Sequence, residues 1–135
     1  MKITKLASGP GCDLYALIIK EDCLVQEFIS RLEDRDKKKI LALFNFILQK
    51  GPPFNETRFR YLGDEIYELK TVSGVRILSF FGNPILRKPL ILTHGFYKPK
   101  KMQLKREKKR AVNWHKEYFQ IADKRNETEN TGMKS

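Results

Sequence analysis

Cysteine, histidine and tryptophan are scarce in this chain of 135 residues, which contains two, two and one of them. Cys12 and Cys23 are too few for a disulfide framework and lack the paired spacing of a structural zinc site, so we expect a reducing compartment. The sequence also lacks a glycine-rich nucleotide fingerprint, a P-loop and an HExxH segment. We therefore expect neither a metal ion nor a cofactor.

Long apolar runs are missing as well. The N-terminal segment MKITKLASGPGCD lacks an apolar core long enough for a signal peptide. No later run approaches the roughly 20 apolar residues that a membrane helix needs. We expect a cytoplasmic protein without membrane contact.

Acidic residues are the minority among the charges, since 27 Lys and Arg stand against 16 Asp and Glu for a formal net charge of +11. Residues 1–36 contain five basic and seven acidic residues, for a net charge of −2. Residues 37–135 contain 22 basic and nine acidic residues, for a net charge of +13. Clustered cations gain free energy by releasing counterions from a phosphate backbone. We expect an anionic partner to meet the second part of the chain.

The apolar residues are numerous enough for one compact domain, at 41% of the chain with nine Phe and five Tyr. We predict a single domain over residues 1–122 and a disordered tail over 123–135, where nothing can be buried. Apolar periodicity predicts an edge strand near 14–19, then two helices that form a hairpin, the first capped by Asp22 and the second ended by Gly51.

Between Arg58 and Phe96 the apolar period changes from 3.6 to about two, which is typical of strands. Turn residues separate the segments FRYL, EIYELKTV, VRILSFFG and KPLILTHGF. From Gln103 to Ala122 the pattern is helical again. The predicted class is α+β, with a mostly antiparallel sheet of about four strands, an N-terminal helical hairpin and a C-terminal helix.

Basic side chains fall on one face of the predicted sheet. Arg76 alternates with apolar neighbours, and Lys70 shares its face with Glu68. With His94 and Lys98 near the end of a neighbouring strand, these residues predict a concave basic surface. RNA cleavage by attack of the 2′-hydroxyl on the adjacent phosphate needs such cations, together with a base and an acid.

Each of these residues also has a plain structural interpretation, which stays open. A lone Arg on a half-exposed strand is more often solvated, and a strand-end His is more often held by structural hydrogen bonds. The run from Lys105 to Arg110 is by default a solvated helix face. Tyr61, Tyr67 and Phe96 are by default packing residues rather than base-stacking platforms.

Three segments together carry a resemblance: FISRLEDRDKKKILALFNFILQKGPPF, YLGDEIYELKTVSGVRILSFFG and LILTHGFYKPKKMQLKREKKRAV. In their order and spacing they are similar to the phage-derived HigB/RelE-type toxins of bacterial type II toxin–antitoxin systems. The resemblance covers most of the chain, from about Leu14 to Phe119. It departs from the usual pattern after Lys98, where the chain reads Pro99 and where Leu104 replaces a proline.

The resemblance implies a RelE-like microbial-ribonuclease fold and an mRNA endoribonuclease that acts without a metal, typically on the ribosome, and is neutralised by a cognate antitoxin. Arg76, His94 and Lys98 match the catalytic positions. The RNA-binding candidates are Lys70, Lys100, Lys101, Lys105 and Arg106. Two alternatives remain: a non-catalytic module that binds RNA or the ribosome, and a degenerate toxin that acts only in an antitoxin complex.

Overall fold

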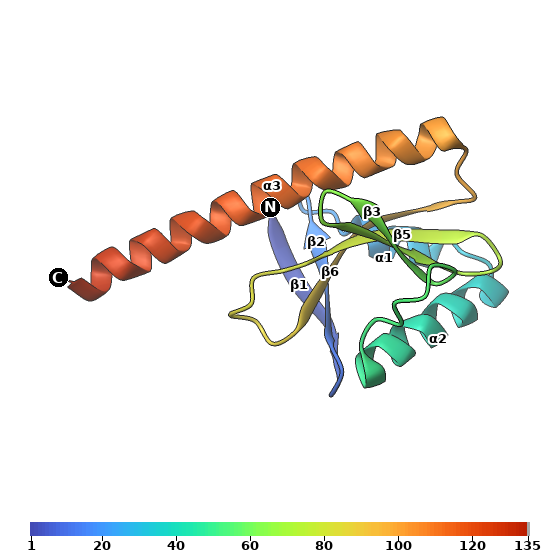
Figure 1. Cartoon of the computed structure of the whole chain (residues 1–135), viewed down its shortest axis with the longest axis horizontal. Coiled ribbons are helices and arrows are strands. Elements are labelled where there is room, and N and C mark those ends of the chain that lie inside the picture. The colour runs from blue at the N-terminus through green and yellow to red at the C-terminus, as the bar shows by residue number, and fades with distance from the viewer. Residues whose placement is uncertain (135) are drawn as a thin grey trace.

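The computed structural model describes the backbone of residues 1–134 and the side chains of residues 1–121. Six strands and three helices make an α+β protein, as predicted (Figure 1). In chain order they are β1 (Lys2–Ser8), β2 (Asp13–Ile18), α1 (Leu24–Ser30), α2 (Asp34–Lys50), β3 (Phe59–Gly63), β4 (Ile66–Lys70), β5 (Val75–Phe81), β6 (Pro89–Tyr97) and α3 (Lys101–Lys134).

The six strands form one mixed sheet in the order β1-β2-β6-β5-β4-β3. Neighbouring strands are antiparallel except β2 and β6, which run parallel with Asp13 opposite Pro89. The predicted sheet of about four strands is therefore wrong. Half-exposed side chains at the edge give β1 no clear alternation, and a parallel pair between distant segments leaves no trace in local sequence patterns.

The predicted edge strand near 14–19 exists as β2, but it lies inside the sheet between β1 and β6. The predicted N-terminal helical hairpin is wrong too, because α1 and α2 follow two strands and each packs on the sheet. Cys23, not Asp22, precedes α1, while the backbone of Asp22 pairs with Ile19 in a tight turn. The expected end of α2 is confirmed at Gly51, which has a positive φ of 84°.

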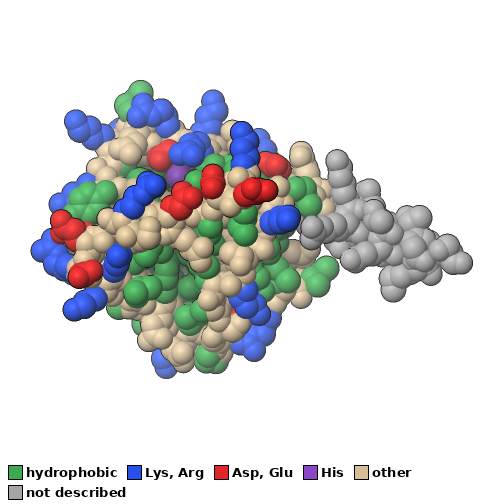
Figure 2. Space-filling view, turned by 180° about the vertical axis from the view of Figure 1, so that it is seen from behind, with side chains coloured by type: hydrophobic (Ala, Val, Ile, Leu, Met, Phe, Trp, Pro, Cys, Tyr) green, Lys and Arg blue, Asp and Glu red, His purple; other side chains and the backbone are tan. Residues whose placement is uncertain are grey.

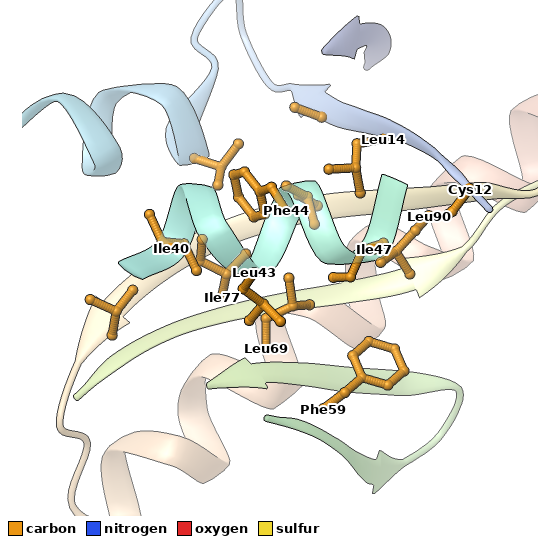
Figure 3. Packing of buried hydrophobic residues seen from close by; sticks show 14 residues of the cluster. Cys12, Leu14, Ile40, Leu43, Phe44, Ile47, Phe59, Leu69, Ile77 and Leu90 are labelled. Carbon is orange, nitrogen blue, oxygen red and sulfur yellow. The ribbon is translucent and has the colours of Figure 1, made fainter. Parts of the chain in front are cut away.

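Helices α1 and α2 cover one face of the sheet (Figure 3). The apolar residues of α2 recur every three or four positions and meet alternate residues of the central strands. We call this cluster the α2-side core; its members include Leu14, Val25, Ile40, Leu43, Phe44, Ile47, Leu69, Val75, Ile77, Leu90 and Leu92.

Helix α3 covers the opposite face (Figure 1). The α3-side core includes Tyr15, Leu17, Ile66, Leu78, Phe80, Ile91, Phe96, Ala111 and Tyr118. Both faces of the sheet are therefore buried over its central strands, and exposed side chains remain along the edge strands β1 and β3 and near the strand ends. No helix within residues 1–134 combines the length and apolar character needed to cross a bilayer.

The predicted tail over 123–135 lies outside the residues whose side chains the structure describes, although the backbone of α3 continues to Lys134. The boundary of the single domain at residue 122 stays a prediction.

Candidate functional site

Lys70 and Arg76 face each other across the β4–β5 hairpin, so the predicted juxtaposition is present. Both side chains are half-exposed. They lie on the α3 side of the sheet, because their neighbours Leu69 and Ile77 point into the α2-side core. The Arg76 guanidinium donates hydrogen bonds through Nη1 to the carbonyls of Thr71 and Val75, each at 2.9 Å, and is thereby held beside the turn.

His94 reaches the same face only because β6 is irregular. Leu90 and Leu92 point into the α2-side core, and strict alternation would direct His94 the same way. Instead, the register shifts between Ile77 and Ser79 on β5, which leaves an extra residue on β6. This β-bulge turns His94 toward α3.

His94 is enclosed between the sheet and α3, with 4% of its surface exposed. The Thr93 hydroxyl donates to the carbonyl of Leu78, so its oxygen accepts from Nδ1 of His94 at 2.9 Å. The Nε2 atom then faces a carboxylate oxygen of Glu107 at 3.5 Å. Trp114 packs edge-on against the imidazole, with 5.0 Å between ring centroids.

Burial lowers the pKa of His94 to about 4, although the nearby Glu107 carboxylate acts in the opposite direction. At neutral pH the imidazole is therefore uncharged, and its contact with Glu107 is not an ion pair. Glu107 instead forms an ion pair with Arg110, in which Oε1 and Nη1 are 3.2 Å apart. His94 can take up a proton at Nε2 only at low pH or when solvent reaches it.

Lys98 lies at the same end of the sheet but away from Arg76. Its backbone N–H donates to Gly74 at 2.8 Å, and its φ is +36°. Its Nζ lies 5.5 Å from the ring centroid of Tyr97, which pairs with Val75 of the α2-side core. The ammonium group is thus directed toward the face opposite Arg76.

The remaining predicted cations lie where β6 leads into α3. Lys100, Lys101, Lys105 and Arg106 are all exposed. Figure 2 shows one face of the molecule, where many Lys and Arg side chains, with several Asp and Glu among them, lie in the upper half and apolar side chains lie below them. The excess of cations suits contact with an extended polyanion.

Three residues on this face have no role predicted from their place in the sequence. Glu107 is the only acid between Lys98 and Arg110, and this isolation in a basic run was the available signal. Arg60 and Glu68 form a pair on β3 and β4, with Nη2 and Oε1 3.0 Å apart. Their partnership depends on strand register, which residue type does not reveal.

The described residues contain no group of three or more His, Cys, Asp or Glu side chains that could hold a metal ion. What the site offers is cationic: two half-exposed side chains from the sheet and a basic helix beside them. Such groups can bind phosphates and stabilise negative charge on them. The imidazole of His94 is enclosed between the sheet and α3.

A model of the family described as phage derived protein Gp49-like (DUF891) matches residues 27–126. The match begins in α1 and reaches into α3, and so includes Lys70, Arg76 and His94, whereas β1 and β2 lie outside it. No curated protein and no solved structure gives a significant match. Because the match spans well over half of the sequence, this chain belongs to the phage-derived Gp49-like family.

Proposed function

We propose that this chain is the toxin of a type II toxin–antitoxin system and cleaves mRNA on the ribosome as a cytoplasmic endoribonuclease without a metal ion. The observation that carries the proposal is the cross-strand pair of Lys70 and Arg76, half-exposed on the face of the sheet that α3 covers. Family membership supports it, since Gp49-like proteins are associated with such toxins. The resemblance to HigB/RelE-type toxins supports the finer assignment.

In the proposed reaction the 2′-hydroxyl of the RNA attacks the adjacent phosphate, and the bond to the 5′-oxygen breaks. The planar guanidinium of Arg76 suits two oxygens of the phosphorane, and Lys70 adds a second positive charge. Lys100, Lys101, Lys105 and Arg106 hold the flanking backbone or ribosomal RNA. The same basic surface suits an acidic antitoxin that covers it and stops the reaction.

His94 acts as acid or base only where RNA or the ribosome opens its enclosure, because its Nε2 atom faces Glu107 in the structure described here. Proton transfer requires the acid or base to come within hydrogen-bond reach of the substrate, and such geometry often forms only in the complex. Lys98 joins the site only if its side chain turns away from Tyr97.

The enclosure of His94 also favours a second candidate, a module that binds RNA or the ribosome without cleaving it. The same cations serve that role and no acid or base is needed. A degenerate toxin that acts only in its antitoxin complex is the weaker alternative, favoured by the departure from the family pattern after Lys98.

Expression of the chain alone in a bacterial host, followed by mapping of transcript 5′ ends, tests the proposal. We expect growth arrest and new 5′ ends within translated codons. Arg76→Ala should lower cleavage about 100-fold, since one donor to the developing charge is lost. The matched control is Arg35→Ala, which removes the same charge from an exposed position on α2.

Thermal unfolding of each variant shows whether the fold survives, because Arg76 also bonds to the turn. Full cleavage by a folded Arg76→Ala variant would remove Arg76 from the reaction. Growth arrest without new 5′ ends would favour the binding module, and neither effect would favour the degenerate partner.

A further inference from the structure

Glu68 is a carboxylate with no exposed surface in the middle of β4. Its neighbours Tyr67 and Leu69 pack in or against the α2-side core, so alternation directs Glu68 to the α3 side, as it does Lys70 two residues later. A buried carboxylate is costly unless a cation and hydrogen bonds compensate for lost water. The question is what this charge does there.

Arg60 supplies the compensating charge from β3. It stands directly opposite Glu68 in the strand register, and its Nη2 lies 3.0 Å from Oε1. The carboxylate is 1% exposed and the arginine side chain 37%, so the guanidinium connects the interior to the surface. Nη2 of Arg60 is thus held at Glu68, while more than a third of the side-chain surface stays exposed.

Stability alone gives little reason for this pair. Apolar residues of similar volume often stabilise a protein as much as a buried ion pair or more. The pairing is also incomplete, because Nε of Arg60 and both oxygens of Glu68 are buried without a well-aligned hydrogen bond among the described residues. The pair does, however, restrict a long side chain that would otherwise sample many rotamers.

The fixed arginine lies next to the cations already described. Arg60, Lys70 and Arg76 come from three consecutive strands and occupy one face of the sheet. Neighbouring β-strands are about 4.8 Å apart, and residues two apart on one β-strand are about 7 Å apart. The three long side chains can therefore reach successive phosphates of one RNA strand. A guanidinium held in advance loses less freedom when it binds.

We propose that Arg60 is a third phosphate-binding residue of this site and that the buried Glu68 is its positioning residue. The ligand is a phosphate of single-stranded RNA next to the one bound by Arg76. The inference rests on the proposed function, since it requires RNA on this face. It concerns binding, so it can be tested apart from cleavage.

The test measures the affinity of the full chain for a fluorescently labelled single-stranded RNA whose riboses are 2′-O-methylated, so that no nucleophile is present. The dissociation constant is recorded over a series of KCl concentrations. Each phosphate contact on a single strand contributes about 0.7 to the slope of log K against log salt concentration. The slope therefore counts local contacts, which a purely structural pair would not change.

The main variant is the double substitution Arg60→Leu with Glu68→Leu. It removes one positive and one negative charge, so the net charge of +11 is unchanged and no lone buried charge remains. We expect about tenfold weaker binding and a slope smaller in magnitude by about 0.7.

The matched control is Lys5→Leu with Asp13→Leu, an exposed lysine and a buried aspartate 3.9 Å apart on β1 and β2. It also keeps the net charge, and its affinity and slope should equal those of the wild type. Glu68→Gln is the second variant. It raises the net charge, which by general attraction would strengthen binding, whereas loss of the fixed arginine should weaken it.

Unfolding curves first establish that each variant is folded. Wild-type slope and affinity in the folded double variant, or tighter binding by Glu68→Gln, would overturn this inference and leave the proposed function intact. Failure of the wild type to bind this RNA in a salt-dependent way would also overturn the inference, whereas the proposed function depends on the mapping of transcript 5′ ends.

Discussion

His94 lies between the hydroxyl of Thr93 and the carboxylate of Glu107, and it shows how much a residue's chemistry depends on its surroundings. A histidine at a strand end is by default a titrating group near neutral pH. Here burial lowers its pKa to about 4, so the folded protein holds the ring neutral. The same residue therefore links the stability of the fold to pH.

We predict that wild-type stability decreases as the pH falls from about 6.5 to 4. The unfolded chain protonates His94 at its ordinary pKa of 6.5, whereas the folded chain does so only near 4, so acid favours unfolding across this window. A difference of this size corresponds to about 3 kcal/mol. Urea unfolding of wild type and His94→Gln at pH 7, 5 and 4 measures it.

The variant should lose this part of the pH dependence. Burial also lowers the pKa of the other histidine, His115, so His115→Gln is the matched control; this ring is only partly buried and should contribute less. Equal pH dependence in wild type and His94→Gln would show that His94 is not held neutral by the fold.

Which cations share a face of the sheet could be predicted from the sequence. Which side chains contact one another could not. Alternation placed Lys70 and Arg76 together correctly, because it depends only on the two-residue period of a strand. The contacts of Glu68 with Arg60 and of His94 with Glu107 depend on register and on helix position. Neither is a local property of the chain.

Among the elements, β6 has the most demanding surroundings. It is flanked by β2 and β5, and α1 packs closely on its backbone. A Cβ atom at Gly95 would collide with the ring of Phe28. Gly95 therefore sets how near α1 lies to the strand that carries His94.

We predict that Gly95→Ala lowers the free energy of unfolding by about 1–3 kcal/mol, because the added methyl group overpacks the contact between α1 and β6. Thermal or urea unfolding measures the change. Combining it with Phe28→Leu should restore part of the loss, so the two changes should not be additive. Strict additivity would mean that the Phe28 ring is not what limits the space at Gly95.

At the scale of the whole molecule, the two faces of one sheet pack in two cores, the α2-side core and the α3-side core. Strand β6 contributes Leu90 and Leu92 to the α2-side core and Ile91 to the α3-side core. Damage to one core should therefore weaken the other, and the protein should unfold in a single step.

Leu43→Ala tests this coupling. Leu43 is buried in the α2-side core, and its truncation should cost about 2–5 kcal/mol. The fluorescence of Trp114, the single tryptophan, reports on the α3 side. Its unfolding midpoint should fall together with the midpoint seen by far-UV circular dichroism.

Leu41→Ala, at an exposed position of the same helix, is the control and should change stability by less than about 0.5 kcal/mol. Separate midpoints for the two signals in Leu43→Ala would contradict the idea of a shared core.

The overall architecture was only partly predictable for the same physical reason. The helix of residues 34–50, the strands from β3 to β6 and the start of α3 follow from hydrophobic periodicity within each segment. The position of β2 inside the sheet follows from its pairing with β6, whose residues come much later in the chain. The pattern of apolar residues within β2 does not indicate with which distant strand it pairs.

This late pairing has a consequence for the order of events during synthesis. The β1–β2 hairpin leaves the ribosome first, yet β2 keeps an unpaired edge until β6 has emerged. Folding must then close a large loop before the central contact forms, which makes such topologies slow. A nascent chain thus cannot complete its sheet until β6 has been translated, so the face that carries Lys70 and Arg76 is completed late in synthesis.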